Sequence, residues 1–186
     1  MSEKKRCAWC NMKNPTYIQY HDVEWGKPNF SDEYLYEMLI LESFQAGLSW
    51  ECVLNKREHF RKAYDHFDLN KVISYGDNKI NELLSNKNII RNKLKIHASI
   101  HNSRIFQAIL REYGSFYHYL KTFAGEEILY ETDRTTNDLS DAISKDLQRR
   151  GMKFAGSTII YSYLQAIGLI HSHEQGCFLY RKKLKK

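Results

Sequence analysis

Four residues of the types that bind metal ions stand in two pairs near opposite ends of the chain. Cys7 and His21 form the first pair; His173 and Cys177, with three residues between them, form the second. A His-x3-Cys pair on one helical turn or in a tight loop presents a nitrogen and a sulfur atom together. Two cysteines and two histidines are a donor set that suits tetrahedral zinc. With four protein ligands and no open position, such a site would be structural rather than catalytic.

The spacing leaves two interpretations of these residues open. In the first, zinc joins the two ends of the chain, and the metal–ligand bonds are strong enough to offset the entropy cost of closing so long a loop. In the second, the cysteines are buried core residues and the histidines lie on the surface without a common role. Cys10 forms a Cys-x2-Cys spacing with Cys7, but no second such pair exists to complete a zinc knuckle.

Aromatic residues gather in the first 50 positions. All three tryptophans of the chain, Trp9, Trp25 and Trp50, fall there, beside tyrosines such as Tyr17 and Tyr20. Aromatic side chains most often fill a hydrophobic core, and that interpretation applies here too. A dense local set with carboxylates nearby is also suited to wall a pocket for a planar ring, above all a cationic one.

Composition and charge bound the class of protein. The 186 residues predict one domain or two interlocked lobes, and 42% apolar with 27% charged residues excludes collagen, low-complexity disorder and a disulfide miniprotein. No apolar run suits a membrane-spanning helix or a signal peptide, so we expect a cytoplasmic protein with reduced cysteines. The net charge of +6 comes mostly from a basic tail, which is suited either to hold phosphate or to be a solvated terminus. That tail holds Arg181, Lys182, Lys183, Lys185 and Lys186.

The elements that must position these residues are helices. Only 2 prolines and 9 glycines interrupt the chain, and several helix-start signals are present, such as Ser31-Asp32-Glu33. The first of these helices carries Glu42 one turn after Met38 and ends at Gly47. Residues 124–138 show little periodicity and predict a loop. The other helices are predicted from 50 towards 64, in a short segment after Asp68, from 77, from 92 to 113, from 115 to 123, from 139 to 150 and from 156 to 168.

Residues 85–91 connect two of these helices and have the form of a helix–hairpin–helix motif. In such a motif, backbone N–H groups of the turn and of the second helix hold a DNA phosphate. Lys87, Arg91, Lys93 and Lys95 would add positive charge. The same pattern also fits a common antiparallel helix pair with a solvated basic face.

The long helix that follows the hairpin carries several apolar residues at helical spacing. Because a helix of a compact domain buries its apolar stripe, we expect these side chains to face the core. The buried candidates are Leu94, Ala98, Ile105, Ala108 and Ile109.

Five stretches of the chain resemble signatures of one family, the 3-methyladenine DNA glycosylase I family. They are residues 20–26 (YHDVEWG), 41–50 (LESFQAGLSW), 88–93 (NIIRNK), 150–156 (RGMKFAG) and 161–169 (YSYLQAIGL). The second stretch is the most specific, and all five occur in the family's order between Cys7 and Cys177.

The resemblance implies an all-α helix–hairpin–helix glycosylase bundle. It implies one structural zinc per chain, held by Cys7, His21, His173 and Cys177, with Cys10 outside the family pattern. The chain would then be a single domain, 1–186. Within it we expect a zinc-tied terminal lobe (7–30 with 170–180), a helical core (31–169, hairpin near 85–92) and a basic tail (181–186).

The same resemblance implies an enzyme that excises 3-methyladenine from alkylated double-stranded DNA. It makes Glu42 the acid that contacts the base and Trp50 its stacking partner, with Tyr20 at the pocket. Without the motif, Glu42 would be assigned to a surface or salt-bridged position, since buried glutamate is uncommon. Trp9, Tyr17 and Trp25 are then expected in or around the pocket wall.

The expected reaction is monofunctional, because no lysine matches a nucleophile position. Free 3-methyladenine would be the product and an abasic site would remain. Leu48, after Gly47, is expected to enter the gap that the flipped base leaves. The DNA backbone would be held by Lys87, Asn88, Arg91 and Lys93, where Asn88 replaces a common glycine and tolerates the left-handed conformation.

Two other functions fit parts of the sequence. One is a non-catalytic DNA-binding module that uses the same hairpin. The other is a metal-held interaction domain without a DNA role. We expect a monomer without membrane contact in each case.

Overall fold

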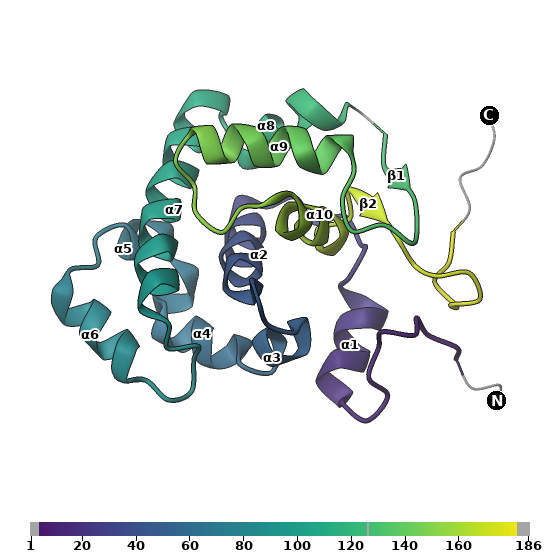
Figure 1. Ribbon diagram of the computed structural model, residues 1–186, viewed down its shortest axis with the longest axis horizontal. Helices are drawn as coiled ribbons and strands as arrows, with labels where there is room; N and C mark the ends of the chain where they lie inside the picture. The colour runs from purple at the N-terminus through teal and green to yellow at the C-terminus, as the bar shows by residue number, and fades with distance from the viewer. Residues whose placement is uncertain (1–3, 126, 182–186) are drawn as a thin grey trace.

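The computed structural model describes residues 4–125 and 127–181, and nearly all of its regular structure is helical (Figure 1). No helix in these ranges is both long and apolar enough to cross a membrane. Of the expected basic tail, 182–186 lie outside the described residues. The elements are α1 (Pro15–Val23), α2 (Asp32–Gln45), α3 (Trp50–Leu54), α4 (Arg57–Ala63), the 3-10 turn η1 (Asp65–Phe67), α5 (Leu69–Val72), α6 (Asp77–Ser85), α7 (Lys93–Tyr113), α8 (Phe116–Ala124), β1 (Leu129–Tyr130), α9 (Asp138–Arg149), α10 (Ser157–Ala166) and β2 (Ile170–His171).

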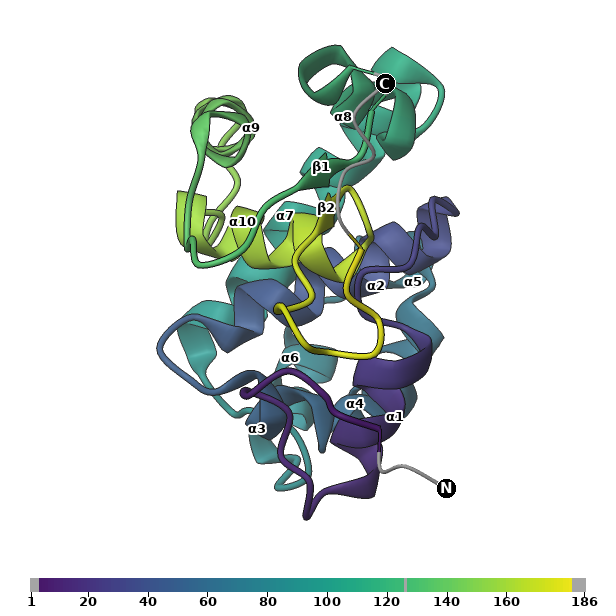
Figure 2. The same cartoon turned by 90° about the vertical axis from the view of Figure 1, so that its right-hand side faces the viewer.

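Helices α2 and α10 lie at the centre of the molecule and pack against each other (Figure 1). Helix α7 packs on α2, and α9 packs on α10. Helix α10 is buried around most of its circumference, as its apolar sequence predicts. The segment that leads into α1 and the segment that follows β2 lie on the same side of the molecule (Figures 1 and 2). The two terminal segments therefore come together beside the central helix pair.

Side-chain caps define where several helices begin. The Ser31 hydroxyl accepts a hydrogen bond from the Tyr34 amide, and the Ser49 hydroxyl accepts one from the Cys52 amide. The Ser115 hydroxyl caps α8 in the same way. These contacts satisfy amide groups that have no partner within the helix. The helix starts expected at these three serines are confirmed.

Three expectations about the elements need correction. The helix predicted from 50 towards 64 is two helices, α3 and α4, separated by a turn at Asn55 and Lys56. The predicted loop 124–138 contains β1, which pairs in parallel with β2. Helix α1 was not predicted, although Asn14 and Pro15 form a standard helix start. The Asn14 side chain accepts hydrogen bonds from two backbone amides at the start of this helix.

The buried face of α7 differs from the apolar stripe. Ala98 and Ile109 are buried and Ile105 is half-buried, but Leu94 is 73% exposed and Ala108 is exposed. The expectation for Leu94 and Ala108 is therefore wrong. The face that packs on the core is rotated away from them and includes polar positions that the apolar count ignores.

Two serines of α7 explain this rotation. Ser99 and Ser103 are fully buried and donate to carbonyl groups of their own helix. Their hydroxyls also bond the buried phenols of Tyr64 and Tyr36, at 3.0 and 2.6 Å. Because both partners are satisfied, these serines enter the core without the usual penalty for burying a hydroxyl.

Gly168 joins the N-terminal segment to the end of α10. Its φ is +81°, and a Cβ atom there would lie 2.5 Å from the Lys27 carbonyl carbon and from the Pro28 nitrogen. The amide of Gly26 donates to the Gln165 carbonyl, so the chain after α1 follows this helix end closely. Only glycine allows this approach of two backbones.

We predict that Gly168→Ala destabilises the protein by about 2–5 kcal/mol, because strain at positive φ adds to a backbone clash. Gly114→Ala is the matched control, since Gly114 has φ +79° and nothing within 4 Å of the added Cβ. The control should lose only about 1–2 kcal/mol. Urea unfolding of both variants measures the difference, and equal losses would contradict the close packing at Gly168.

Candidate active site

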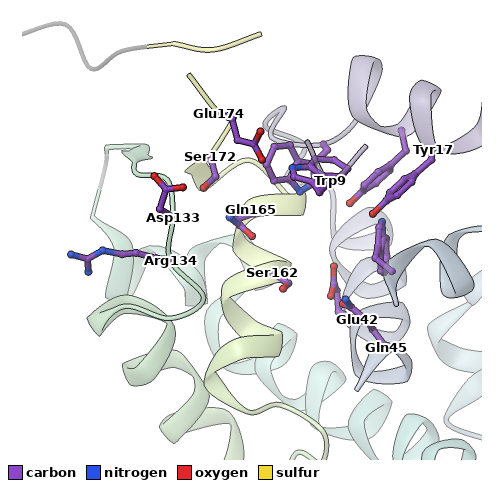
Figure 3. Close-up of a pocket in the computed structure, with 13 residues that line it drawn as sticks. Trp9, Tyr17, Glu42, Gln45, Asp133, Arg134, Ser162, Gln165, Ser172 and Glu174 are labelled. Carbon is purple, nitrogen blue, oxygen red and sulfur yellow. The ribbon is translucent and has the colours of Figure 1, made fainter. Parts of the chain in front are cut away.

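A cavity of about 280 Å³ lies between α2, α10 and the two terminal segments (Figure 3). Glu42 and Gln45 reach it from α2, and Ser162 and Gln165 reach it from α10 (Figure 3). The cavity is lined by Trp9, Tyr17, Tyr20, Trp25, Glu42, Gln45, Trp50, Asp133, Arg134, Ser162, Gln165, Ser172 and Glu174. It thus has one aromatic wall and one polar wall.

The aromatic wall contains all five aromatic residues expected at the pocket. The rings of Tyr20 and Trp50 lie 5.5 Å apart between centroids. Trp9 packs edge-on against Trp25 at 4.7 Å and tilted against Tyr17 at 5.4 Å. In such contacts each ring restricts the orientation of its neighbour, so the wall is formed before any ligand binds. Its faces are suited to a planar and electron-poor ring.

Glu42 is the acid of this cavity, and it is only 2% exposed. Its Oε2 atom has no hydrogen-bond partner, and neither do the Trp50 indole N–H and the Gln45 side-chain oxygen. Burial raises the pKa of Glu42 well above its ordinary value. An acid on an exposed helix face, the assignment without the motif, would show neither feature. Unpartnered buried polar atoms that border one cavity indicate a ligand that supplies their partners.

An ion-pair network holds α1 beside this cavity. The Arg57 guanidinium binds both carboxylate oxygens of Glu24, at 2.6 and 2.8 Å, and also binds Glu37 at 2.6 Å. The Tyr34 hydroxyl also donates to Glu24. Because Arg57 comes from α4 and Glu37 from α2, the end of α1 is fixed to two helices of the core. This places Tyr20, one turn earlier on α1, against the cavity.

Cys7, His21, His173 and Cys177 come together in a buried cluster, with their donor atoms all within 4.8 Å of one another. Cys7 Sγ lies 3.5 Å from His173 Nδ1, and Cys177 Sγ lies 3.5 Å from His21 Nε2. A tetrahedral zinc with ordinary bond lengths would hold sulfur and nitrogen about 3.5 Å apart. The residues therefore fit a metal ion, and the alternative of buried cysteines with surface histidines is wrong.

The surroundings of the cluster also match a metal centre. The His21 Nδ1 atom lies 2.8 Å from Asp22, whose carboxylate is paired with Arg6. Backbone amides of Glu174 and Leu179 point at the Cys7 and Cys177 sulfurs at 3.4 Å. A carboxylate behind a histidine and amides directed at sulfurs are the usual outer contacts of metal ligands.

The pKa values of the cluster point the same way. Burial lowers the pKa of His173 to about 4, which keeps the neutral ring that binds metals. Burial also raises the pKa of the Cys7 thiol to about 12, so that a thiolate there needs a nearby cation. Cys10 lies outside the cluster; it is buried, and its thiol points at the Tyr17 carbonyl.

The cluster and the cavity share a wall. The Trp9 ring lies 5.2 Å from the His21 ring, and the Trp25 ring lies 4.7 Å from the His173 ring. Glu174, which lines the cavity, accepts a hydrogen bond from the Ala8 amide at 2.6 Å. The four residues of the cluster thus support the aromatic wall from behind.

Comparison with known proteins accounts for this arrangement. The model of the methyladenine glycosylase family matches residues 9–180. The chain belongs to the methyladenine glycosylase family. DNA-3-methyladenine glycosylase 1 of Escherichia coli K12 is 38% identical over 182 residues, covering 95% of this chain and 97% of that protein. DNA-3-methyladenine glycosylase of Haemophilus influenzae is 34% identical, covering 92% and 96%.

Solved structures of the family agree with the fold. A crystal structure of 3-methyladenine DNA glycosylase I matches with a TM-score of 0.90 and 39% identity, covering 95% of this chain and 100% of that one. The Staphylococcus aureus 3-methyladenine DNA glycosylase I, solved for 3-methyladenine recognition, matches with a TM-score of 0.90 and 31% identity, covering 97% and 99%. The all-α fold is confirmed, and the chain is an enzyme of the class that hydrolyses N-glycosyl bonds. A non-catalytic module and a pure interaction domain no longer describe it.

The hairpin residues of this methyladenine glycosylase lie away from the cavity lining. Lys87, Asn88, Arg91 and Lys93 are all exposed at the connection between α6 and α7. Asn88, which would tolerate the left-handed conformation, does not adopt it. Lys95 was expected to add charge to the same surface, and that is wrong, because Lys95 is only 8% exposed and its ammonium group binds backbone carbonyls.

Several residues that line the cavity of this chain were not predicted from the sequence. Ser162, Gln165 and Gln45 lie inside stretches that carry the family resemblance, so those motifs could have indicated them. Asp133 and Arg134 lie in the segment predicted to be a featureless loop. They reach the cavity because the pairing of β1 with β2 carries the following residues to its rim.

We predict that Glu42→Gln makes the ligand-free protein more stable at neutral pH. The raised pKa means that the folded state holds a proton on Glu42 that the unfolded state releases above about pH 4.5. Stability contributed by this group therefore falls as the pH rises above that value. Thermal unfolding should show a higher Tm for Glu42→Gln at pH 7 than for the wild type, with the gap closing near pH 4. A gap that does not change with pH would contradict the burial of this carboxyl group.

Proposed function

We propose that this enzyme removes 3-methyladenine from alkylated double-stranded DNA, releasing the free base and leaving an abasic site. The observation that carries the proposal is the unpartnered, buried carboxyl group of Glu42 at an aromatic-walled cavity. A relative at 31% identity, a variant of 3-methyladenine DNA glycosylase I with a TM-score of 0.89, is in complex with 3-methyladenine. That complex supports the choice of base.

Charge explains how such a cavity would select its base. Adenine methylated at N3 is cationic while it is attached to the sugar, whereas adenine is neutral. Packing against the aromatic faces of Tyr20 and Trp50 favours the cationic ring. A cation beside Glu42 offsets the cost of ionising a buried acid, and the resulting carboxylate accepts a hydrogen bond from the exocyclic amine. Adenine offers no such compensation, so the cavity would discriminate through charge as well as shape.

The reaction requires that the nucleotide leave the duplex, because a base that stays stacked in DNA cannot reach a cavity inside the protein. Leu48 is 42% exposed in the turn that follows α2, next to the cavity residue Gln45. We propose that Leu48 fills the space left in the base stack. The exposed hairpin side chains at Lys87, Asn88, Arg91 and Lys93 would hold the DNA backbone, as in a helix–hairpin–helix.

The expected chemistry is hydrolysis without strand cleavage. The positive charge on the base already weakens the glycosidic bond, so stabilising the departing base and admitting water suffices. None of the described residues that line the cavity is a lysine. The chain therefore offers no amine there to form a Schiff base with the sugar.

We propose that the buried cluster binds one structural zinc. Two thiolates and two neutral imidazoles match the donor preference of zinc and leave no position open for substrate. The zinc would tie the segment 7–30 to the segment 170–180, so that its role is structural. Because Trp9 and Trp25 pack on the ligand rings, the metal would also support the base pocket.

The first test is base release from methylated duplex DNA, resolved by chromatography. The wild type should release 3-methyladenine and leave 7-methylguanine in place. Glu42→Gln should fold and bind free 3-methyladenine about tenfold or more weakly, since a charge-assisted hydrogen bond is lost. Unchanged affinity would remove Glu42 from base recognition. A Schiff base trapped with borohydride would contradict monofunctional hydrolysis.

The metal test is an elemental analysis combined with chelation. We expect about one zinc per chain, and a large fall in Tm after chelation because metal binding contributes to folding. Cys177→Ser should lose the zinc, whereas Cys10→Ser is the matched control and should keep it. A stable metal-free wild type would contradict the assignment.

A further inference from the structure

Lys95 is a buried lysine at the junction of three elements. It is 8% exposed, and none of the ion pairs between described residues includes it. Its Nζ donates to the carbonyl groups of Phe44 at 2.7 Å and Ala46 at 2.6 Å. The same group lies 5.9 Å from the centre of the Phe154 ring, in the connection between α9 and α10. A lysine without an acidic partner is uncommon in a protein interior, so its two carbonyl contacts must compensate for its burial.

Those carbonyl groups belong to the end of α2 and to the turn that follows it. Ala46 leaves the helix with φ −44° and ψ 115°, and Gly47 has φ +76°. The Leu48 amide donates to the Gln45 carbonyl at 2.6 Å. These values define a type II β-turn over Gln45–Leu48, for which glycine is needed at the third position.

A type II turn differs from a type I turn in the orientation of its central peptide group. In this turn the central peptide joins Ala46 to Gly47, and its carbonyl oxygen is the one that Lys95 binds. The ammonium group therefore selects one of two orientations of this peptide. It also binds the Phe44 carbonyl group at the C-terminal end of α2, where a positive charge is favourable.

Lys95 connects this turn to the hairpin. It lies on α7 two residues after Lys93, where the exposed hairpin connection becomes helix. The turn carries Leu48, which is exposed, and Gln45, which lines the cavity. A single buried ammonium group thus links the first turn of α7 to the segment between the cavity and the surface.

We propose that Lys95 is a positioning residue that holds the Gln45–Leu48 turn in the orientation needed for Leu48 to enter the DNA. This inference rests on the proposed function, since it assigns the turn a role in opening the duplex. Lys95 touches neither base nor phosphate and acts only through the Ala46–Gly47 peptide. The exposed hairpin and the turn would then contact DNA in a fixed position relative to each other.

The test compares Lys95→Met with Lys145→Met, a control that removes a charge from an exposed position of α9. Lys95→Met keeps an apolar side chain of similar length and removes the donor. Single-turnover release of 3-methyladenine from duplex DNA should fall about tenfold or more in Lys95→Met, as expected for loss of charge-assisted hydrogen bonds. Affinity for free 3-methyladenine, measured by tryptophan fluorescence, should not change. Lys145→Met should match the wild type in both measurements. Equal losses of rate and of free-base affinity would show a general packing role and overturn the proposal.

A double-variant cycle tests whether Lys95 acts through Leu48. Leu48→Ala alone should slow release from duplex DNA, and adding Lys95→Met should slow it little further, because the positioned side chain is already gone. Independent effects that multiply would overturn the proposal. If Lys95→Met does not fold, Lys95→Gln keeps a polar side chain but is shorter and removes the positive charge. It should show the same separation between duplex rate and free-base affinity.

Amide hydrogen exchange separates this inference from the proposed function. In free protein, exchange at Leu48 should be faster in Lys95→Met than in the wild type and in Lys145→Met, because the turn loses its fixed central peptide. Unchanged exchange would overturn the proposal even if the enzyme releases base. If the wild type releases no base from any duplex, the proposed function fails, and faster exchange would then support only the structural part of the inference.

Discussion

A carboxyl group kept away from water without a partner is the constraint on which the rest of the site depends. Glu42 holds this position because the last turns of α2 pack between α7 and α10 and face a cavity lined by the terminal segments. Such a group costs stability until a ligand arrives, so the surrounding structure must be rigid enough to maintain it. In the proposed function, the same cost would make the cavity selective for a cationic ring that carries a donor group.

The rigidity comes from contacts that join distant parts of the sequence. The network of Arg57 with Glu24 and Glu37 fixes the end of α1 to two core helices. The Cys/His cluster brings the first and last described segments together behind Trp9 and Trp25. Neither contact touches the cavity centre, yet both determine where its aromatic wall stands. Stability and recognition are therefore linked in this lobe, and loss of the cluster would affect both.

The helices were largely predictable because their signals are local. Caps at Ser31, Ser49 and Ser115 and the apolar circumference of α10 are properties of short segments. Which face of α7 is buried was not predictable in this way. Leu94 is exposed and Lys95 is buried, because the lysine has two carbonyl partners that belong to a segment far away in the sequence. Hydrophobicity alone assigns these two neighbours the wrong way round.

The sequence by itself determined the family and indicated the residue types of the Cys/His cluster and of the pocket, since motifs carry that information directly. Tertiary structure decided the burial, the hydrogen-bond partners and the pKa of each group. Glu42 became a buried acid with a raised pKa, and Lys95 became a partner of the Gln45–Leu48 turn. Burial, hydrogen-bond partners and pKa depend on atoms brought together from distant segments. The sequence pattern therefore identifies the functional groups, whereas only the folded chain determines their chemical properties.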